Sequence, residues 1–450
     1  MQRMGRHSET FTGSGSRRVS RLRVGESDAE TVMAPAKSSR RARIFSATID
    51  QGFSSASNGI FTFAVAVVST TEEFGGIVLM ITALIAILVT QRGALGTPLL
   101  LKSDQTTERI RREGSFAISA GLAIGCAALA VMVLFGRTLG LPALLLGVAA
   151  PIVLCQDVLR YVTIAEGRPH VAAIWDGVWF LGTVLLIVSA WLKISTVSWL
   201  IGGWASLGLI AAVGIATDLR VRPRVAGLRR WATAGWQHRI RYGVDAGLEQ
   251  TTVFLVLAMA AALVSATATA ALRGATVLLS PIAILASALQ LVVISESTRD
   301  SAPPRTVWFA SLRLLGGIAA LAVIVGVVLC SLPGSIGAYL LGESFEPARQ
   351  VLPIVVIEYC ATAVAFALGV FLRTFNRSSA VVRFKIVLMT ATLSTSCCGA
   401  LLFRSATGIA VGLAVGTILA SSLGLAYFAP WEARKRASSV DVAAVAEVTE

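Results

Sequence analysis

Long apolar stretches separated by short polar segments dominate the chain from residue 44 to residue 429. Each is about 18 to 25 residues long, the length that an α-helix needs to cross about 30 Å of hydrocarbon. The pattern predicts an all-α integral membrane protein with twelve membrane-spanning helices. They are expected at 44–69, 76–99, 115–136, 141–163, 170–192, 195–217, 243–264, 275–295, 308–331, 351–372, 384–403 and 406–429.

Composition supports this prediction and excludes several classes of function. Of the 450 residues, 55% are hydrophobic and 14% charged, and the mean hydropathy is +0.75, outside the range of soluble globular domains. The six cysteines fall within predicted spans, where thiols behave as small apolar side chains. The three histidines show no metal-ligand spacing, and no catalytic motif is present. We expect no enzymatic activity, no cofactor and no metal site.

The distribution of Lys and Arg sets the orientation in the membrane, because these residues accumulate on the cytoplasmic side of inserted helices. With a cytoplasmic N-terminus, basic residues gather in the odd-numbered polar segments. The external loops carry only one each, namely Arg137, Lys193, Arg273, Arg349 and Arg404. Both termini are therefore predicted to be cytoplasmic in a multi-pass protein of the plasma (inner) membrane. The +14 net charge follows from this bias and favours contact with anionic membrane lipids, not nucleic acid.

Five segments follow from these patterns. Residues 1–43 are predicted to be a disordered basic cytoplasmic arm, and residues 431–450 an unstructured cytoplasmic tail. The first six spans form an N-lobe at 44–217, and the last six form a C-lobe at 243–430. Between them, 218–242 is a basic cytoplasmic linker in which tryptophans are interleaved with arginines, a composition that suits an interfacial helix.

A weak internal repeat relates the two lobes. "IDQG" opens the first predicted span and "VDAG" opens the seventh, so that Asp50 aligns with Asp245 and Gly52 with Gly247. The turns "EEFGG" and "ALRGA" follow the two spans. Because each half has an even number of spans, the copies should be related by an axis along the membrane normal, with a central cavity between them.

Ionisable residues within the spans are the candidate site residues, because a charged group that faces lipid is costly and usually turns toward a bundle interior or water. The candidates for the cavity or substrate site are Asp50, Arg92, Asp157, Arg160, Asp176, Asp245, Glu249, Arg273 and Glu358. Glu296 and Arg313 also lie in or near spans but carry no assigned role.

Each candidate also has a structural interpretation that the sequence leaves open. Asp157 and Arg160, three positions apart, could form an ion pair that Asp176 joins. The acidic residues at the starts of the first and seventh spans could instead sit among headgroups. Arg273 is placed at the external mouth. Glu358 lies deep in its span, so it requires a buried partner or a proton.

Several stretches resemble a known family. "DQGFSSASNGIFTFAVAVVSTTEEFGGIVLMITALIAILVTQRGALGTPLL", "CQDVLRYVTIAEGRPHVAAIWDGVWF" and "LLGESFEPARQVLPIVVIEY" resemble bacterial polysaccharide exporters and lipid-linked oligosaccharide flippases. These belong to the multidrug/oligosaccharidyl-lipid/polysaccharide (MOP) superfamily, and the likeness is to actinobacterial forms. It covers most of residues 44–430. The chain departs from lipid II flippases, which carry arginines on the first helix where this chain has Asp50, Gln51 and Asn58.

The resemblance implies a transporter that flips or exports a lipid-linked saccharide by alternating access. It implies that Arg92, Arg160 and Arg273 bind phosphates and that a proton or sodium ion is a coupling ion. Glycosyltransferases or polymerases would be protein partners. Two other functions stay open: a drug or small-cation antiporter of the same superfamily, with Asp50 or Asp245 as the cation site, and a non-transporting membrane subunit of a polysaccharide synthesis complex.

Overall fold

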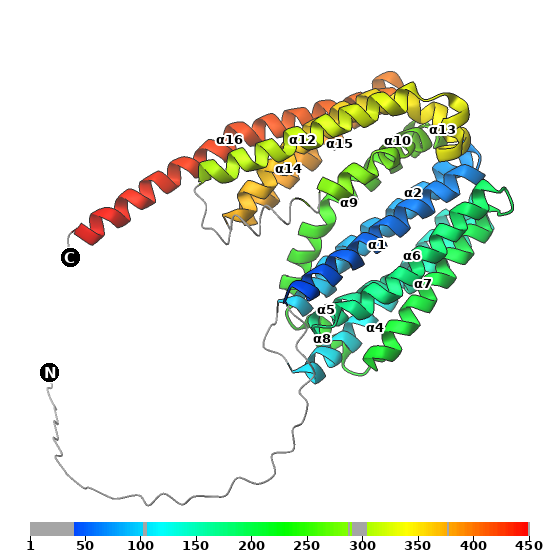
Figure 1. Ribbon diagram of the computed structural model, residues 1–450, viewed down its shortest axis with the longest axis horizontal. Coiled ribbons are helices and arrows are strands. Elements are labelled where there is room, and N and C mark those ends of the chain that lie inside the picture. The colour runs from blue at the N-terminus through cyan, green and yellow to red at the C-terminus, as the bar shows by residue number, and fades with distance from the viewer. Residues whose placement is uncertain (1–39, 102–105, 287–288, 290–303, 376–377, 449–450) are drawn as a thin grey trace, which may run out of the picture. The chain divides into compact units, whose positions relative to one another are not determined.

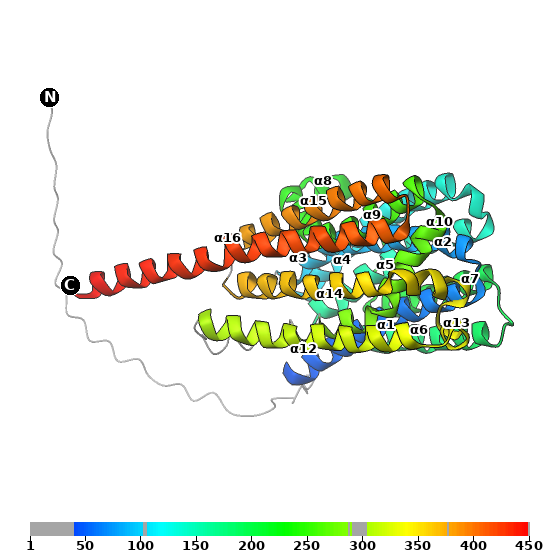
Figure 2. The ribbon, with the colours of Figure 1, turned by 90° about the horizontal axis from the view of Figure 1, so that it is seen from above.

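The computed structural model describes residues 40–101, 106–286, 289, 304–375 and 378–448, and all of its regular elements are helical. The predicted arm lies outside the described residues as far as residue 39. Figures 1 and 2 show the arrangement of the helices. The N-lobe contains α1 (Arg40–Val68), α2 (Thr71–Gln91), η1 (Arg92–Gly96), α3 (Thr97–Leu100), α4 (Thr107–Phe135), η2 (Arg137–Leu139), α5 (Leu141–Ala165), α6 (Pro169–Trp191) and α7 (Val197–Leu219).

The second lobe follows a short connecting helix, α8 (Leu228–Thr233). It begins with a helix that starts inside the predicted linker, at Trp236. The C-lobe contains α9 (Trp236–Leu263), α10 (Ala266–Leu278), α12 (Pro304–Ser331), α13 (Gly334–Leu341), η3 (Gly342–Ser344), α14 (Phe345–Thr374), α15 (Ser378–Phe403) and α16 (Ala406–Val448). The predicted unstructured tail is thus helical as far as Val448.

Ten helices of the described chain are long and apolar enough to cross a membrane. An eleventh results if Ala266–Leu278 and Ser280–Ala286, which meet at a 49° bend, form one span. Helix α1, which covers the first predicted span, is not among these helices, because its first half carries Asp50, Gln51 and Asn58 and is less apolar. The fold is all-α, with two lobes of membrane-spanning helices.

Helix packing repeats between the lobes. In the N-lobe, α1 packs on α6, α4 on α5, and α5 and α6 on α7. In the C-lobe, the corresponding helices make the same pairs: α9 packs on α15, α12 on α14, and α14 and α15 on α16. This correspondence agrees with the alignment of the first and seventh spans that the sequence suggested.

The two turns predicted from the repeat lie earlier in the chain than expected. "EEFGG" falls inside α2, which Thr70 caps by accepting a hydrogen bond from the Glu73 amide. "ALRGA" falls inside α10, which Ser265 caps in the same way through the Ala268 amide. A hydroxyl at the N-cap satisfies an amide that the helix leaves unpaired, so each helix begins at the polar residue before the predicted turn. The segment between the predicted spans 308–331 and 351–372 is also largely helical, as α13, η3 and the start of α14.

The hydrophobic core is shared by the lobes at one end only. We call the end that carries the α1–α2 and α6–α7 connections the outer end, and the opposite end the inner end, following the predicted topology. At the outer end, one cluster joins both lobes and includes Phe61, Phe74, Leu257, Leu341 and Phe345. At the inner end, each lobe has its own cluster, around Phe116 in the N-lobe and Phe371 in the C-lobe. The lobes therefore pack together at the outer end and keep separate cores at the inner end.

The two seams between the lobes differ in how tightly they pack. α2 packs along α9 and α10, and a Cβ at Gly93 or Gly247 would collide with Tyr242 or Thr90 across that seam. Glycine permits this close approach because it has no side chain. The symmetric partner of the α2–α9 seam is the α1–α10 seam, which packs far less extensively among the described residues. At Gly52, which the repeat aligns with Gly247, a Cβ would meet open space.

Candidate functional site

A buried charge network occupies the N-lobe between α1, α5 and α6, with Arg160 at its centre. The Arg160 guanidinium lies 2.6 Å (Nη2–Oδ2) from Asp50, 3.1 Å (Nη1–Oδ1) from Asp157 and 2.9 Å (Nε–Oδ2) from Asp176. The four residues are 1–2% exposed. Three separate helices thus contribute carboxylates to one guanidinium, and these opposite charges compensate one another away from water.

Arg92 extends this network toward the seam. Its Nη2 lies 2.6 Å from Asp157 Oδ1 and its Nε donates to Oδ2 at 3.3 Å, so the pair is bidentate. Arg92 is the first residue of η1, a π-helical turn that is followed by Pro98. Its side chain is 21% exposed, against 3% for Asp157. Arg92 therefore has the most exposed charged side chain of the network.

Polar residues that the sequence analysis did not single out complete the network. Gln156 donates to Asp176 Oδ1, and Arg160 Nη1 donates to Ser54 Oγ at 3.0 Å. Gln91 donates to the Leu154 carbonyl at 2.7 Å. Two signals could have identified them: Gln91 and Gln156 each stand directly before a charged candidate, and both interrupt an apolar span.

Asp245 and Glu249 do not reproduce this network in the C-lobe. Lys385 of α15 lies 3.1 Å from Asp245 Oδ1 and also donates to its carbonyl at 2.6 Å. The Asp245 side chain is 42% exposed. Glu249, one turn further along α9, is exposed. Asp245 nevertheless pairs with the helix that corresponds to α6, the helix that carries Asp176.

Glu358 forms a second polar group, deeper in the C-lobe. Thr362 donates to its Oε1 at 2.6 Å, and Thr417 of α16 is a further hydrogen-bond partner. Glu249 of α9 is close enough for its charge to act on Glu358.

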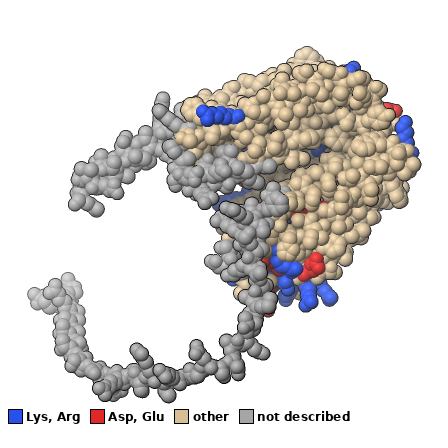
Figure 3. Space-filling view, viewed as in Figure 1, with Lys and Arg blue, Asp and Glu red and all other residues tan. Residues whose placement is uncertain are grey.

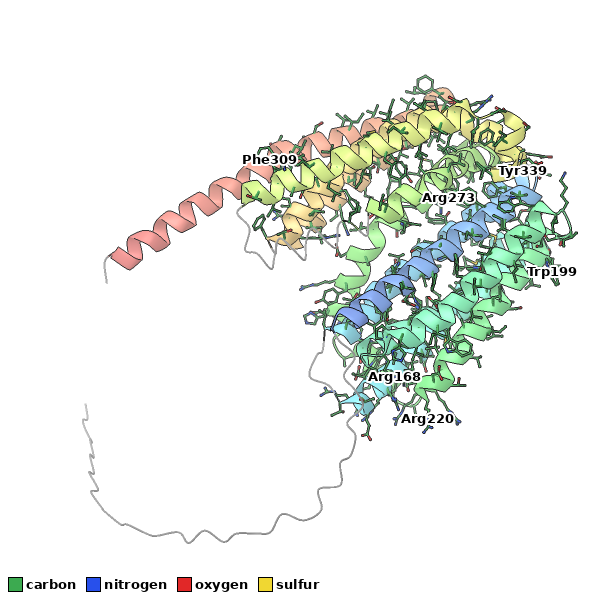
Figure 4. The ribbon with its side chains drawn as sticks, viewed as in Figure 1. Arg168, Trp199, Arg220, Arg273, Phe309 and Tyr339 are labelled. Atoms are coloured by element: carbon green, nitrogen blue, oxygen red, sulfur yellow. The ribbon has the colours of Figure 1, made fainter. Side chains whose placement is uncertain are left out.

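Arg273 lies within α10 and not at the external mouth. Helix α10 begins at Ala266, two turns before Arg273, because Ser265 caps it. Its Nε is buried and has no hydrogen-bond partner, and the described residues offer its guanidinium no ion pair. Tyr359 of α14 is within electrostatic range of Arg273, and the Tyr359 hydroxyl donates to the Thr276 carbonyl at 3.3 Å. Figure 4 shows Arg273 on α10, the helix that packs against α2 of the other lobe.

The first half of α1 presents a second, uncharged polar surface. Gln51 is exposed, and its amide donates to Ser55 at 3.2 Å. Asn58 is half-buried, and the Cβ positions of Gly52 and Gly59 meet open space. These residues are spaced on one face of the helix, while Asp50 points to Arg160 on another.

Of the other charged residues, Arg313 is exposed on α12 and Glu296 lies outside the described residues.

Comparison with known proteins identifies the fold. No protein-family model and no curated protein matches the chain. Solved structures do match. An inward-facing multidrug-resistance MATE family transporter of the MOP superfamily is 12% identical, with a TM-score of 0.64, and the match covers 89% of this chain and 99% of that one. The chain has the fold of MOP-superfamily transporters.

Two other structures with the MOP fold match over similar lengths. The lipid II flippase MurJ in an inward closed conformation is 12% identical, with a TM-score of 0.64, and the match covers 86% of this chain and 87% of MurJ. A MOP superfamily transporter from Pyrococcus furiosus is 14% identical, with a TM-score of 0.54 and coverage of 89% and 96%. The TM-score is 0.53 with an outward-facing MATE transporter. A MATE family transporter and a lipid II flippase are therefore equally similar to this chain in TM-score and identity.

Proposed function

We propose that the chain is a membrane transporter that moves a lipid-linked saccharide across the plasma membrane by alternating access. The observation that carries the proposal is the difference between the two seams: within the described part of the chain, α2–α9 is tightly packed, whereas α1–α10 is not. A substrate whose lipid tail stays in the bilayer needs a lateral route to the space between the lobes. The loosely packed seam supplies that route.

The surface beside this seam suits a saccharide. Gln51, Ser55 and Asn58 on α1 offer amide and hydroxyl groups that both donate and accept hydrogen bonds. A sugar hydroxyl that enters hydrocarbon without a partner costs on the order of a few kcal/mol, and a diphosphate costs far more. A polar surface beside the lipid reduces this barrier. The separate cores of the lobes at the inner end give access from the side where such substrates are assembled.

The surroundings of two of the three arginines expected to bind phosphate support that role. Arg273 has no protein partner for its guanidinium among the described residues, and Arg92 is partly exposed at the edge of the charge network. A guanidinium suits phosphate oxygens because its N–H groups form a planar fork. Arg160 is different, since three carboxylates surround it and it is 2% exposed. Its role is to hold α1, α5 and α6 together.

Deletion of the protein in its host tests the proposal. We expect one lipid-linked saccharide to accumulate on the inner leaflet, identified by mass spectrometry of extracted lipids, and the wild-type chain to restore its normal level. Arg273→Gln should fail to restore it, whereas Arg404→Gln at the outer end should succeed. If no lipid-linked intermediate accumulates, the saccharide substrate is excluded.

A cation-coupled antiporter is the second candidate, and the environment of Glu358 within the C-lobe favours it. Asp50 and Asp245, the cation sites expected from sequence, are each engaged by a basic residue, Arg160 or Lys385. Among the described residues, Glu358 has hydroxyl partners, Thr362 and Thr417, and no basic partner. Efflux of cationic dyes from cells, abolished by Glu358→Gln and kept by Asp245→Asn, would support the antiporter in place of the flippase.

A further inference from the structure

The segment that connects the lobes, residues 220–242, forms a basic surface that the transport proposal does not use. We call it the connector platform. It includes α8 and the first two turns of α9, and it lies at the inner end of α4. Figure 4 shows Arg168 and Arg220 at this end of the N-lobe, with Trp199 at the opposite end. Figure 3 shows basic side chains gathered there.

Trp231 fixes the platform to the N-lobe. Its ring is 8% exposed, stacks on Phe116 of α4 at 5.8 Å between centroids, and its Nε1 donates to Glu113 Oε2 at 2.8 Å. The guanidinium of Arg239, a residue of α9, lies 3.4 Å from the centre of the Trp231 ring. These contacts hold the backbone of the connector in one position. The platform is therefore a fixed feature of the lobe.

The outward side of the platform carries unpaired positive charge. No carboxylate of the described chain lies within ion-pair distance of six exposed arginines: Arg220, Arg222, Arg224, Arg229, Arg230 and Arg241. Exposed apolar side chains stand among them, with Val225 75% exposed, Trp236 55% and Ile240 49%. Both kinds of side chain are exposed at the inner end of the N-lobe, and the Arg224 guanidinium also lies over the Phe116 ring, 5.5 Å from its centre.

We propose that the connector platform binds the headgroups of anionic phospholipids in the inner leaflet. Arginine forks match phosphate oxygens, and a tryptophan is most stable at the boundary between headgroups and acyl chains. The interleaved apolar residues favour a lipid surface over an acidic protein segment, because apolar side chains can leave water by inserting among the acyl chains. The position of the platform at the ends of α4, α7 and α9 brings it into the headgroup layer.

Lipid retention by the purified full-length chain tests the proposal. The test variant is Arg222→Gln/Arg229→Gln/Arg230→Gln. The matched control removes three exposed charges at the outer end, as Arg137→Gln/Lys193→Gln/Arg404→Gln. Each protein is extracted from membranes that contain phosphatidylglycerol and phosphatidylcholine, and the bound lipids are identified by native mass spectrometry.

We expect the wild-type protein and the control to retain phosphatidylglycerol in preference to phosphatidylcholine. The platform variant should bind phosphatidylglycerol at least about tenfold more weakly, because each basic residue near an anionic surface adds to the attraction. Raising the ionic strength should release the lipid from the wild-type protein. Equal losses in both variants, no preference for phosphatidylglycerol, or co-purification of an acidic protein in place of lipid would each overturn the proposal. Transport is not measured, so the result is independent of the substrate.

Discussion

The Arg160 and Asp50 side chains meet at 2.6 Å across α5 and α1, although the residues are 110 positions apart in the sequence. With Asp157 and Asp176, Arg160 ties three helices of the N-lobe together. Replacing Arg160 by Met would leave Asp50 and Asp176 buried without a basic partner, whereas Asp157 would keep its pair with Arg92. We expect a loss of about 3 to 5 kcal/mol of stability, the range for removing one partner of a buried pair.

Thermal unfolding in detergent measures this loss. Arg112→Gln is the control, because Arg112 is exposed on α4 and its replacement should change stability by less than about 0.5 kcal/mol. Adding Asp50→Asn to Arg160→Met removes one of the stranded charges and should recover part of the loss. Equal stability of Arg160→Met and the wild-type protein would show that the network does not hold the lobe together.

Gly247 and Gly52 occupy matching positions of the repeat but should respond oppositely to the same change. A Cβ at Gly247 would collide with Thr90, so Gly247→Val should cost about 1 to 3 kcal/mol through overpacking of the α2–α9 seam. Gly52 faces open space, so Gly52→Val should leave thermal stability unchanged or slightly raised. The Gly52 variant should instead slow transport by obstructing the surface of α1.

Comparing the melting temperatures of the two variants with the accumulation of lipid-linked saccharide in cells separates these effects. Gly59→Val, also at an open position on α1, should behave like Gly52→Val. If Gly52→Val proves as destabilising as Gly247→Val, the α1–α10 seam is packed as tightly as its partner.

Arg273 should show a trade-off between stability and function. Its guanidinium is a charge without an ion-pair partner among the described spans. Arg273→Met should therefore increase the free energy of unfolding of the substrate-free protein by about 1 kcal/mol or more, which would raise its melting temperature. The same substitution should abolish substrate binding. Arg273→Lys should keep the charge and lose the fork, and so give intermediate binding. A lower melting temperature for Arg273→Met would indicate a structural role.

The sequence was sufficient to predict the membrane spans and the local charge pairs. Spans follow from the length of each apolar stretch, and residues three apart on a helix, such as Asp157 and Arg160, must be neighbours. It could not show that Asp50 faces the same guanidinium, because the rotation of α1 about its axis depends on packing against α6.

The depth of Arg273 was misjudged because hydropathy alone set the start of the helix. Averaging over a window shifts a boundary toward the apolar centre, whereas the helix begins at the Ser265 cap. The same error placed "EEFGG" in a turn. A search for Ser or Thr before each span would have moved both boundaries and placed Arg273 inside the membrane.

Closure of the lobes at the outer end includes one bond that can be removed without disturbing either core. Trp191, at the end of α6, donates from Nε1 to the Tyr339 carbonyl of α13 at 2.7 Å, and so links the two lobes. Trp191→Phe keeps an aromatic ring at this position and removes the hydrogen bond to the Tyr339 carbonyl, which is worth about 0.5 to 1.5 kcal/mol. If the bond is made only when the outer end is closed, its loss shifts the population toward outward-open states by about two- to tenfold.

Labelling of a Gln51→Cys variant, in a background without the native cysteines, measures this shift. Its thiol should react faster with a membrane-impermeant maleimide added outside when Trp191→Phe is also present. Trp199→Phe, at an exposed tryptophan of the same end (Figure 4), should leave that rate unchanged, and equal acceleration by both variants would contradict the role of the Trp191 bond.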